Sequence, residues 1–135
     1  MFDTKIAIIL LDRLEVWQKL NVTSFLTSGI IGQNSDLIGE NYKDKSNYQY
    51  LPLNRQPVII LSGDTATLKK IHERICKRSL HCSLYISDMF TSGNDEANRQ
   101  TVSRYDSDNL PVVGLAIREE RKIVDKITKG AKLHS

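Results

Sequence analysis

Four side chains in this sequence have types that could carry out acid–base chemistry, namely Lys19, Asp88, Thr91 and Ser92. A carboxylate can act as a base toward water, a lysine can stabilise a developing oxyanion, and a hydroxyl can orient the water. The combination indicates metal-free ester hydrolysis, with Asp88 as the base, Lys19 as the stabilising cation, and Ser92 or Thr91 as the orienting group. The structural alternative is that lysines and aspartates at the ends of helices and strands are caps or solvated charges.

The best-known catalytic motifs do not occur in the sequence. It contains no Gly-x-Gly-x-x-Gly, no phosphate-binding loop ending in Gly-Lys-Ser/Thr, no His-Glu-x-x-His and no Gly-x-Ser-x-Gly. These absences argue against a dinucleotide-dependent enzyme, a nucleoside triphosphatase, a zinc protease and an α/β-hydrolase. The two cysteines, Cys76 and Cys82, do not form a Cys-x-x-Cys pair. We therefore expect no metal and no cofactor.

The N-terminal part of the chain is predicted to be one strand that leads directly into one helix. The stretch from Lys5 to Leu11 is an unbroken apolar run, which is typical of a strand covered on both faces. Asp12 and Glu15 have the spacing of a capping box, which predicts a helix that begins near Arg13 or Leu14. This predicted helix contains the candidate catalytic residue Lys19.

The rest of the chain alternates strands and helices in the same way. The expected elements are a strand at Gln56–Leu61, a helix at Thr65–Lys77 capped by Asp64, a strand at His81–Ser87, a short helix capped by Asn94 or Asp95, a strand at Val112–Ile117 and a helix at Glu119–Ile127. This order predicts a three-layer α/β/α sandwich with a mixed, largely parallel four-stranded sheet. Ligands of such sheets bind beyond the carboxyl ends of the strands, where Asp88 and Arg118 would lie.

The segment between Gly32 and Arg55 has a weaker pattern and is predicted to be a surface excursion, with a short hairpin that turns at Lys45-Ser46-Asn47. It contains Tyr42, Tyr48 and Tyr50. Aromatic side chains beside lysines could stack the bases of single-stranded nucleic acid. We prefer the interpretation that these tyrosines cover the edge of a sheet. A third hypothesis is that the excursion is the contact of a homodimer.

Composition and charge set the class of protein. The chain has 135 residues, of which 40% are hydrophobic and 26% are charged, as expected for a single soluble domain over residues 1–135. No apolar run is long enough to span a membrane, so we expect a cytoplasmic protein without a membrane partner. The net charge of +3 arises between residues 118 and 134, which contain six basic and three acidic side chains. This basic end could bind phosphates or simply be a solvated helix face, and charge alone favours the second interpretation.

Long blocks of the sequence resemble a known family. The blocks are FDTKIAIILLDRLEVWQKLNVTSFLTSGI, IGENY, YLPLNRQP, MFTSGNDEANR and VVGLAIREERKIVDKITKGAKLH, which together extend over nearly the whole chain. They resemble the bacterial family called domain of unknown function two thousand. That family is similar in turn to the type II peptidyl-tRNA hydrolases, whose fold is a mixed four-stranded sheet between helices. The resemblance therefore implies a type II peptidyl-tRNA hydrolase-like fold.

The resemblance carries over only part of the hydrolase site. The hydrolases open their first helix with glycine-lysine-glycine-lysine, followed by a glutamine and a histidine. Trp17-Gln18-Lys19 takes that place here, so one lysine matches and both glycines are absent. Thr23 and Leu26 occupy the glutamine and histidine positions. Most residues of the helix motif of the hydrolases are therefore replaced in this chain.

The remaining matches lie after the third predicted strand. Asp88 matches the aspartate of the hydrolases, and Ser92 or Thr91 matches their threonine. The resemblance thus implies hydrolysis of an ester such as peptidyl- or aminoacyl-tRNA, with RNA as partner. The residues that we expect to bind the substrate are Trp17, Asn21, Arg118, Lys126, Lys129 and Lys132.

A non-catalytic module is the competing hypothesis. Similarity of fold does not carry activity with it, and the altered helix motif favours this view slightly. Such a module would bind a small anionic ligand or a protein partner. Trp17 and Phe90, beside Lys19, would then line its pocket.

Overall fold

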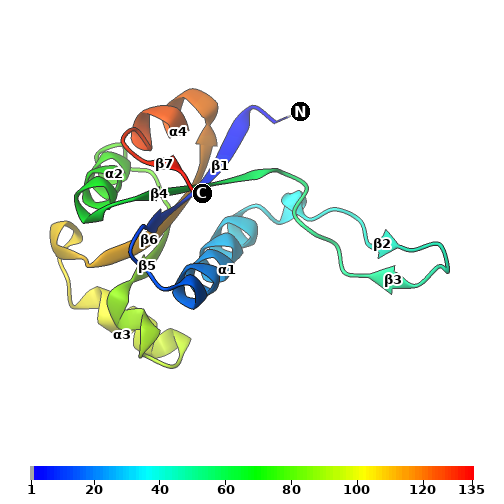
Figure 1. The fold of residues 1–135 in the computed structure, drawn as a ribbon, viewed down its shortest axis with the longest axis horizontal. Helices are drawn as coiled ribbons and strands as arrows, with labels where there is room; N and C mark the ends of the chain where they lie inside the picture. Colours follow the sequence, from blue (N-terminus) through cyan, green and yellow to red (C-terminus); the bar gives the residue numbers. More distant parts are fainter. Residues whose placement is uncertain (1) are drawn as a thin grey trace.

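The computed structural model describes residues 2–135, and within them five strands form one mixed sheet in the order β5-β6-β1-β4-β7 (Figure 1). Their bounds are β1 Thr4–Leu11, β4 Val58–Gly63, β5 Ser83–Ile86, β6 Val112–Glu120 and β7 Lys132–Leu133. β1 pairs with β4 in parallel, whereas β1 with β6, β5 with β6, and β4 with β7 are antiparallel pairs. The predicted mixed sheet is confirmed. The predicted four strands and largely parallel pairing are wrong.

Two features of the chain explain this difference. β7 has only two residues, so it has no periodic pattern of its own, and the pairing of Leu61 with Leu133 defines it. The connection from β5 to β6 runs through η2 (Ser87–Phe90), α3 (Asp95–Ser103) and η3 (Ser107–Asn109). Figure 1 shows α3 beyond the end of the sheet rather than across a face. This connection therefore returns the chain antiparallel, as a long hairpin loop does, instead of crossing over to a parallel strand.

Helices cover both faces of the sheet. α1 (Val16–Gln33) packs on one face against β1, β5 and β6, and α2 (Thr65–Lys77) and α4 (Arg121–Ile127) pack on the other (Figure 1). The central strand β1 is consequently enclosed, and each residue from Ile6 to Leu11 is at most 5% exposed. This is the burial that the unbroken apolar run predicts.

The start of α1 differs from the prediction. The helix begins at Val16, and the backbone N–H of Glu15 donates to Gln18 Oε1 over 2.9 Å. The backbone N–H of Asp12 instead donates to the carbonyl of Gly63 over 2.9 Å, which continues the pairing of β1 with β4. Asp12 is therefore held in the turn by the neighbouring strand and does not cap the helix. The predicted bounds of α2 and its Asp64 cap are confirmed.

A glycine in β6 allows α1 to lie directly on the backbone of the sheet. A Cβ atom on Gly114 would lie 2.6 Å from Val22 Cγ1 and 3.0 Å from Leu26 Cδ1. Both of these side chains are buried on the inner face of α1. The absence of a side chain at residue 114 thus fixes the distance between α1 and the sheet.

Residues 38–54 form an arm that projects away from the rest of the molecule (Figure 1). Its strands β2 (Tyr42–Lys43) and β3 (Gln49–Tyr50) pair in antiparallel fashion, so the predicted hairpin is confirmed. Asn47 takes the left-handed conformation in the turn, with φ of 69°. The three tyrosines lie on this arm, at least half exposed, and not along an edge of the main sheet as we preferred. The hairpin extends outward, so its aromatic side chains do not reach that sheet.

Candidate functional site

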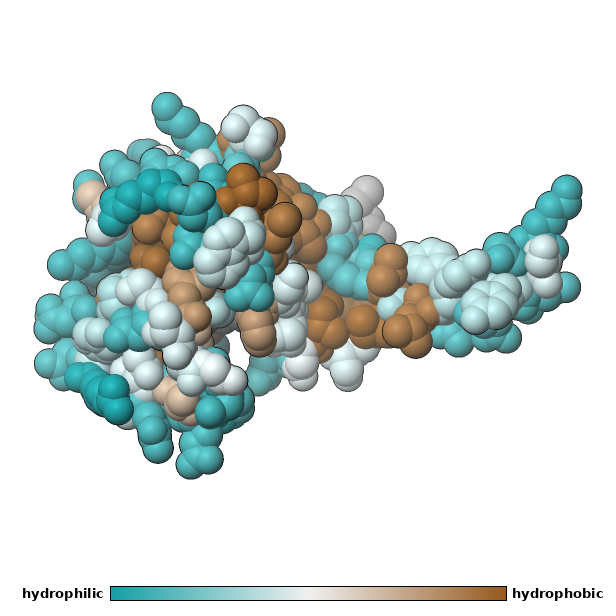
Figure 2. All heavy atoms as spheres, turned by 60° about the horizontal axis from the view of Figure 1, so that its bottom comes forward, coloured by the Kyte–Doolittle hydropathy of each residue, from teal (hydrophilic) through white to brown (hydrophobic). Residues whose placement is uncertain are grey.

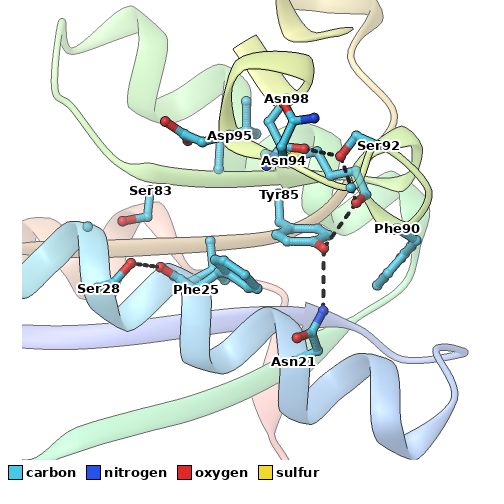
Figure 3. Close-up of a pocket in the computed structure, with 15 residues that line it drawn as sticks. Asn21, Phe25, Ser28, Ser83, Tyr85, Phe90, Ser92, Asn94, Asp95 and Asn98 are labelled. Carbon is cyan, nitrogen blue, oxygen red and sulfur yellow. Dashed lines mark hydrogen bonds between the residues drawn. The ribbon is translucent and has the colours of Figure 1, made fainter.

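A pocket of about 490 Å³ lies between α1, β5 and the segment from η2 to the start of α3. We call it the aromatic pocket, and Figure 3 shows the side chains around it. The residues that line it are Asn21, Phe25, Leu26, Ser28, Gly29, Ser83, Leu84, Tyr85, Met89, Phe90, Ser92, Gly93, Asn94, Asp95 and Asn98. Three separate parts of the chain thus contribute to one cavity.

Aromatic rings form one wall of this pocket. The ring centroids of Phe25 and Tyr85 are 6.0 Å apart, and those of Tyr85 and Phe90 are 5.2 Å apart. Trp17 extends the cluster on the outside, with its ring 5.9 Å from that of Phe90 in an edge-on arrangement. Phe25 remains 56% exposed. Tyr85 is only 4% exposed, so Phe25 supplies most of the open ring surface among the rings that line the pocket.

Amide and hydroxyl groups form the opposite wall. The Ser92 hydroxyl donates to the carbonyl of Met89 over 3.1 Å and contacts the side-chain oxygen of Asn98. Asn94 caps α3 by accepting from the backbone N–H of Ala97 over 2.8 Å. These bonds hold the hydroxyl and amide groups in fixed positions beside the rings (Figure 3).

The aromatic pocket contains little charge. Among its lining residues, all within the described part of the chain, there is no lysine, arginine or histidine, and Asp95 supplies the one carboxylate. Asp95 pairs with Arg99 on the next turn of α3. Burial raises the pKa of Tyr85, so its hydroxyl is uncharged at neutral pH. The pocket therefore suits an uncharged ligand better than the anionic ligand that we expected.

Lys19 lies elsewhere, in a second cavity of about 530 Å³ on the other side of α1. We call it the α1–β4 groove, and its lining residues are Leu10, Val16, Lys19, Leu20, Thr23, Ile60, His134 and Ser135. Lys19 Nζ lies 3.1 Å from His134 Nε2, and His134 Nδ1 lies 2.9 Å from the carbonyl of Ser135. Donation from Nδ1 to that carbonyl would leave Nε2 to accept from the lysine. The structure thus gives Lys19 a histidine as its partner.

Asp88 lines neither the aromatic pocket nor the α1–β4 groove. Its Oδ2 accepts a hydrogen bond from the Tyr105 hydroxyl over 2.9 Å, and this bond raises the pKa of Tyr105. Thr91 is exposed, and its hydroxyl donates to the backbone carbonyl of Asp88 over 3.3 Å. Of the two predicted hydroxyls, Ser92 lines the aromatic pocket and Thr91 does not. Neither cavity is lined by both Lys19 and Asp88.

The predicted substrate-binding residues also lie in different parts of the structure. Asn21 lines the aromatic pocket, and its side-chain nitrogen lies 3.5 Å from the Tyr85 hydroxyl. Arg118 donates from Nε to Gln56 Oε1 and from Nη1 to Asn34 Oδ1, over 2.9 Å in each case. Gln56 is only 4% exposed, so this guanidinium is engaged in joining parts of the fold.

The C-terminal lysines do not line either cavity. Lys126 belongs to α4, on the face of the sheet opposite α1, and Lys129 and Lys132 follow it along the chain. All three are exposed. Their predicted contact with an RNA backbone would therefore be made away from the aromatic pocket.

Sequence reasoning missed Phe25, Tyr85, Asn98 and His134. Phe25 and Tyr85 have the pattern of core residues, and nothing in the sequence around His134 indicates a lysine partner 115 positions away. One signal was present, because Asn21 and its polar neighbours interrupt the apolar side of the first helix. A helix side that mixes apolar and small polar residues is what a pocket wall requires.

Comparison with known proteins places the chain in a family. Residues 4–135 match the family described as protein of unknown function (DUF2000), and the chain belongs to this family. A solved structure, that of the protein of unknown function Atu0240 from Agrobacterium tumefaciens strain C58, is 56% identical to it, with a TM-score of 0.98 and 100% of both chains covered. No curated protein matches the chain.

Within residues 2–135, no helix has the length and apolar character needed to cross a membrane. The same part of the chain brings together no group of three or more histidine, cysteine, aspartate or glutamate side chains that could hold a metal ion.

Proposed function

We propose that this protein is a binding module whose aromatic pocket takes a small uncharged ligand with a flat heteroaromatic ring, such as a nucleoside. Bases are recognised by stacking on aromatic side chains and by hydrogen bonds to their edges. The pocket supplies both requirements, with rings on one wall and the groups of Asn21, Ser92 and Asn98 around it. Its volume of about 490 Å³ lies within the usual range for small-molecule sites.

The exposure of Phe25 is the observation that carries this proposal. Phe25 is 56% exposed, lines the aromatic pocket and has its ring 6.0 Å from that of Tyr85, so an open ring surface faces the cavity where a base could stack. The lack of a cationic lining residue separates this ligand class from the anionic one. A nucleoside should therefore bind more tightly than the corresponding nucleotide, whose phosphate would meet only the carboxylate of Asp95.

Isothermal titration calorimetry of the full chain with adenosine, guanosine, cytidine, uridine and the four monophosphates tests the proposal. Phe25→Ala should weaken the preferred nucleoside by roughly 5- to 150-fold, because stacking of a base on an aromatic ring contributes about 1–3 kcal/mol. Ser92→Ala should weaken it less, and the adjacent Thr91→Ala is the matched control with no change. Absence of binding for all eight compounds, or equal loss for Ser92→Ala and Thr91→Ala, would contradict the proposal.

Ester hydrolysis in the α1–β4 groove is a second candidate function, favoured by the contact between Lys19 and His134. In this scheme the Lys19 ammonium moves from His134 Nε2 to the ester oxygen, which frees Nε2 to take a proton from water, and the resulting hydroxide attacks the ester carbonyl. Lys19 stabilises the oxyanion, whose collapse breaks the bond to the leaving oxygen. His134 returns its proton to that oxygen, so the alcohol leaves, and the acid product ionises to a carboxylate. The resemblance to the type II peptidyl-tRNA hydrolases supports an aminoacyl or peptidyl ester of tRNA as the substrate.

Release of the amino acid or peptide from such esters measures this activity directly. We expect Lys19→Ala and His134→Ala each to abolish it, and Asp88→Ala to leave it intact, since Asp88 lies outside the groove. A loss on Asp88→Ala that matched the loss on Lys19→Ala would restore the acid–base set first predicted from the sequence. No turnover above the buffer rate would remove the hydrolytic candidate and leave the binding proposal untouched.

A further inference from the structure

The outer side of α1 is unusual for a helix that faces solvent. Over its 18 residues, Lys19 is the one charged side chain, whereas solvent-facing helices usually carry charges on the outer face. Val16 is 73% exposed and Leu20 is 66% exposed, and both line the α1–β4 groove together with Ile60. Depletion of charge around exposed apolar side chains is typical of the centre of a protein–protein interface.

The arm presents a second apolar surface. Leu51 is 82% exposed and Leu53 is 60% exposed, and the half-exposed tyrosines lie farther along the same hairpin. Figure 2 shows apolar residues at the root of the arm and on the adjoining body, whereas the tip is hydrophilic. A projecting hairpin of this kind gains its stability from packing against something else, because an isolated two-stranded hairpin is at best marginally stable in water.

The root of the arm is held firmly in the outward direction. The backbone N–H of Gly39 donates to the carbonyl of Leu53 over 3.1 Å, and that of Arg55 donates to the carbonyl of Leu37 over 2.8 Å. Arg55 also donates from its guanidinium to the carbonyl of Asp36 over 2.9 Å. These bonds fix where the arm leaves the body, so its exposed apolar side chains project away from the groove of their own chain and are open to another molecule.

We propose that the partner is a second copy of this chain, and that each arm packs into the α1–β4 groove of the other copy. Such an exchange is self-complementary, as a two-fold dimer requires. Each leg of the hairpin has about eight residues and spans roughly 26 Å, whereas the α1 residues that line the groove run from Val16 to Thr23 over roughly 11 Å. An arm is therefore long enough to cross the whole groove of the other copy.

The available area is sufficient for a stable dimer. Eight large apolar side chains belong to the two surfaces, namely Val16, Leu20, Ile38, Tyr42, Tyr48, Tyr50, Leu51 and Leu53. An aromatic side chain presents about 150–250 Å² and an aliphatic one less, so with roughly half or more of each exposed, these residues offer on the order of 100 Å² each. Complete covering of all eight would bury about 800 Å² per copy, which is the area of a standard interface. The arm would also close the groove that contains Lys19 and His134, so an ester would reach these two side chains only in the monomer.

Sedimentation velocity on the full chain over a concentration series tests the dimer. We expect a species of twice the 15.4 kDa chain mass in the wild type, and a shift to the monomer for Leu51→Asp in the arm and for Leu20→Lys in the groove. Ser46→Asp, at the turn of the hairpin, is the matched control and should remain dimeric. All three side chains are exposed, so circular dichroism should show unchanged folding.

Mixing the two monomeric variants identifies the contact itself. In a heterodimer of Leu51→Asp with Leu20→Lys, one arm and one groove are native, and the other contact pairs aspartate with lysine. We therefore expect the mixture to dimerise although neither variant does so alone. A wild-type chain that is monomeric at all concentrations would overturn the proposal. So would a dimer that survives both substitutions, or a mixture that stays monomeric.

Discussion

The approach of α1 to the sheet predicts opposite effects for two glycine-to-alanine substitutions in this protein. Gly114→Ala places a methyl group 2.6 Å from Val22 Cγ1, which is closer than real Cβ atoms approach, and 3.0 Å from Leu26 Cδ1, which is an unusually tight contact. Overpacking a core in this way costs typically about 1–3 kcal/mol. The alanine recovers about 0.4–1 kcal/mol by restricting the unfolded chain. We expect a net destabilisation of about 1.3 kcal/mol from the midpoints of the two ranges, and of at most about 2.6 kcal/mol.

Gly32→Ala is the matched control, because Gly32 lies in α1 and a Cβ there would have no atom within 4 Å. It should stabilise the protein by about 0.4–1 kcal/mol. Urea unfolding followed by circular dichroism gives both free energies of unfolding by linear extrapolation. The reasoning predicts opposite signs for the two substitutions.

A double substitution tests the cause. In Val22→Ala the space beside residue 114 is larger, so adding Gly114→Ala to it should cost less than adding it to the wild type, by about 0.5 kcal/mol or more. Since Phe25 lies on the same helix, Gly114→Ala should also weaken nucleoside binding. The reasoning fails if Gly114→Ala is as stable as Gly32→Ala, or if the effects of the two substitutions in the pair simply add.

Three other properties follow from individual side chains. Burial raises the pKa of the Cys82 thiol to about 11, so a thiol reagent at pH 8 should modify the exposed Cys76 much faster than the partly exposed Cys82; equal labelling rates would contradict this. Arg118→Met should lower the free energy of unfolding by about 1.5–3 kcal/mol, because it leaves two amide oxygens without their charged donor, and an unchanged urea midpoint would argue against that role. The hydrogen bond from Tyr50 lowers the pKa of Asp44, so its contribution to the hairpin is complete above about pH 4 and is lost as the pH falls through the lowered value. NMR titration of that carboxyl checks the direction, and a midpoint above the ordinary value of an aspartate would reverse it.

The secondary structure could be predicted where local patterns determine it. The apolar run before Asp12 correctly predicts a buried strand, and Asp64 correctly predicts the start of α2. The direction of the strands could not be predicted in the same way, because an antiparallel and a parallel partner place the same demands on a strand enclosed on both faces. The connection from β5 to β6 contains a helix, and a helix between two strands indicates a crossover unless its position in space is known.

The candidate site was harder to predict because it depends on which side of α1 each residue faces. Lys19 and Asn21 are two positions apart, so they lie on different sides of the helix and face different cavities. Ser92 and Thr91 were indistinguishable as sequence neighbours, yet only Ser92 lines the aromatic pocket. The contact of His134 with Lys19 depends on the short strand β7, which brings the end of the chain back beside β4.

The most direct test of the central claim is an NMR titration of the ¹⁵N-labelled protein with its preferred nucleoside, which reports where the ligand binds. We expect chemical-shift changes in the side-chain amides of Asn21 and Asn98 and in the backbone amides of Ser92 and Gly93, which surround the aromatic pocket. The amides of α4, on the other face of the sheet, should not shift. Shifts confined to α4 or to the arm, or none at saturating nucleoside, would contradict the assignment of this pocket as the functional site.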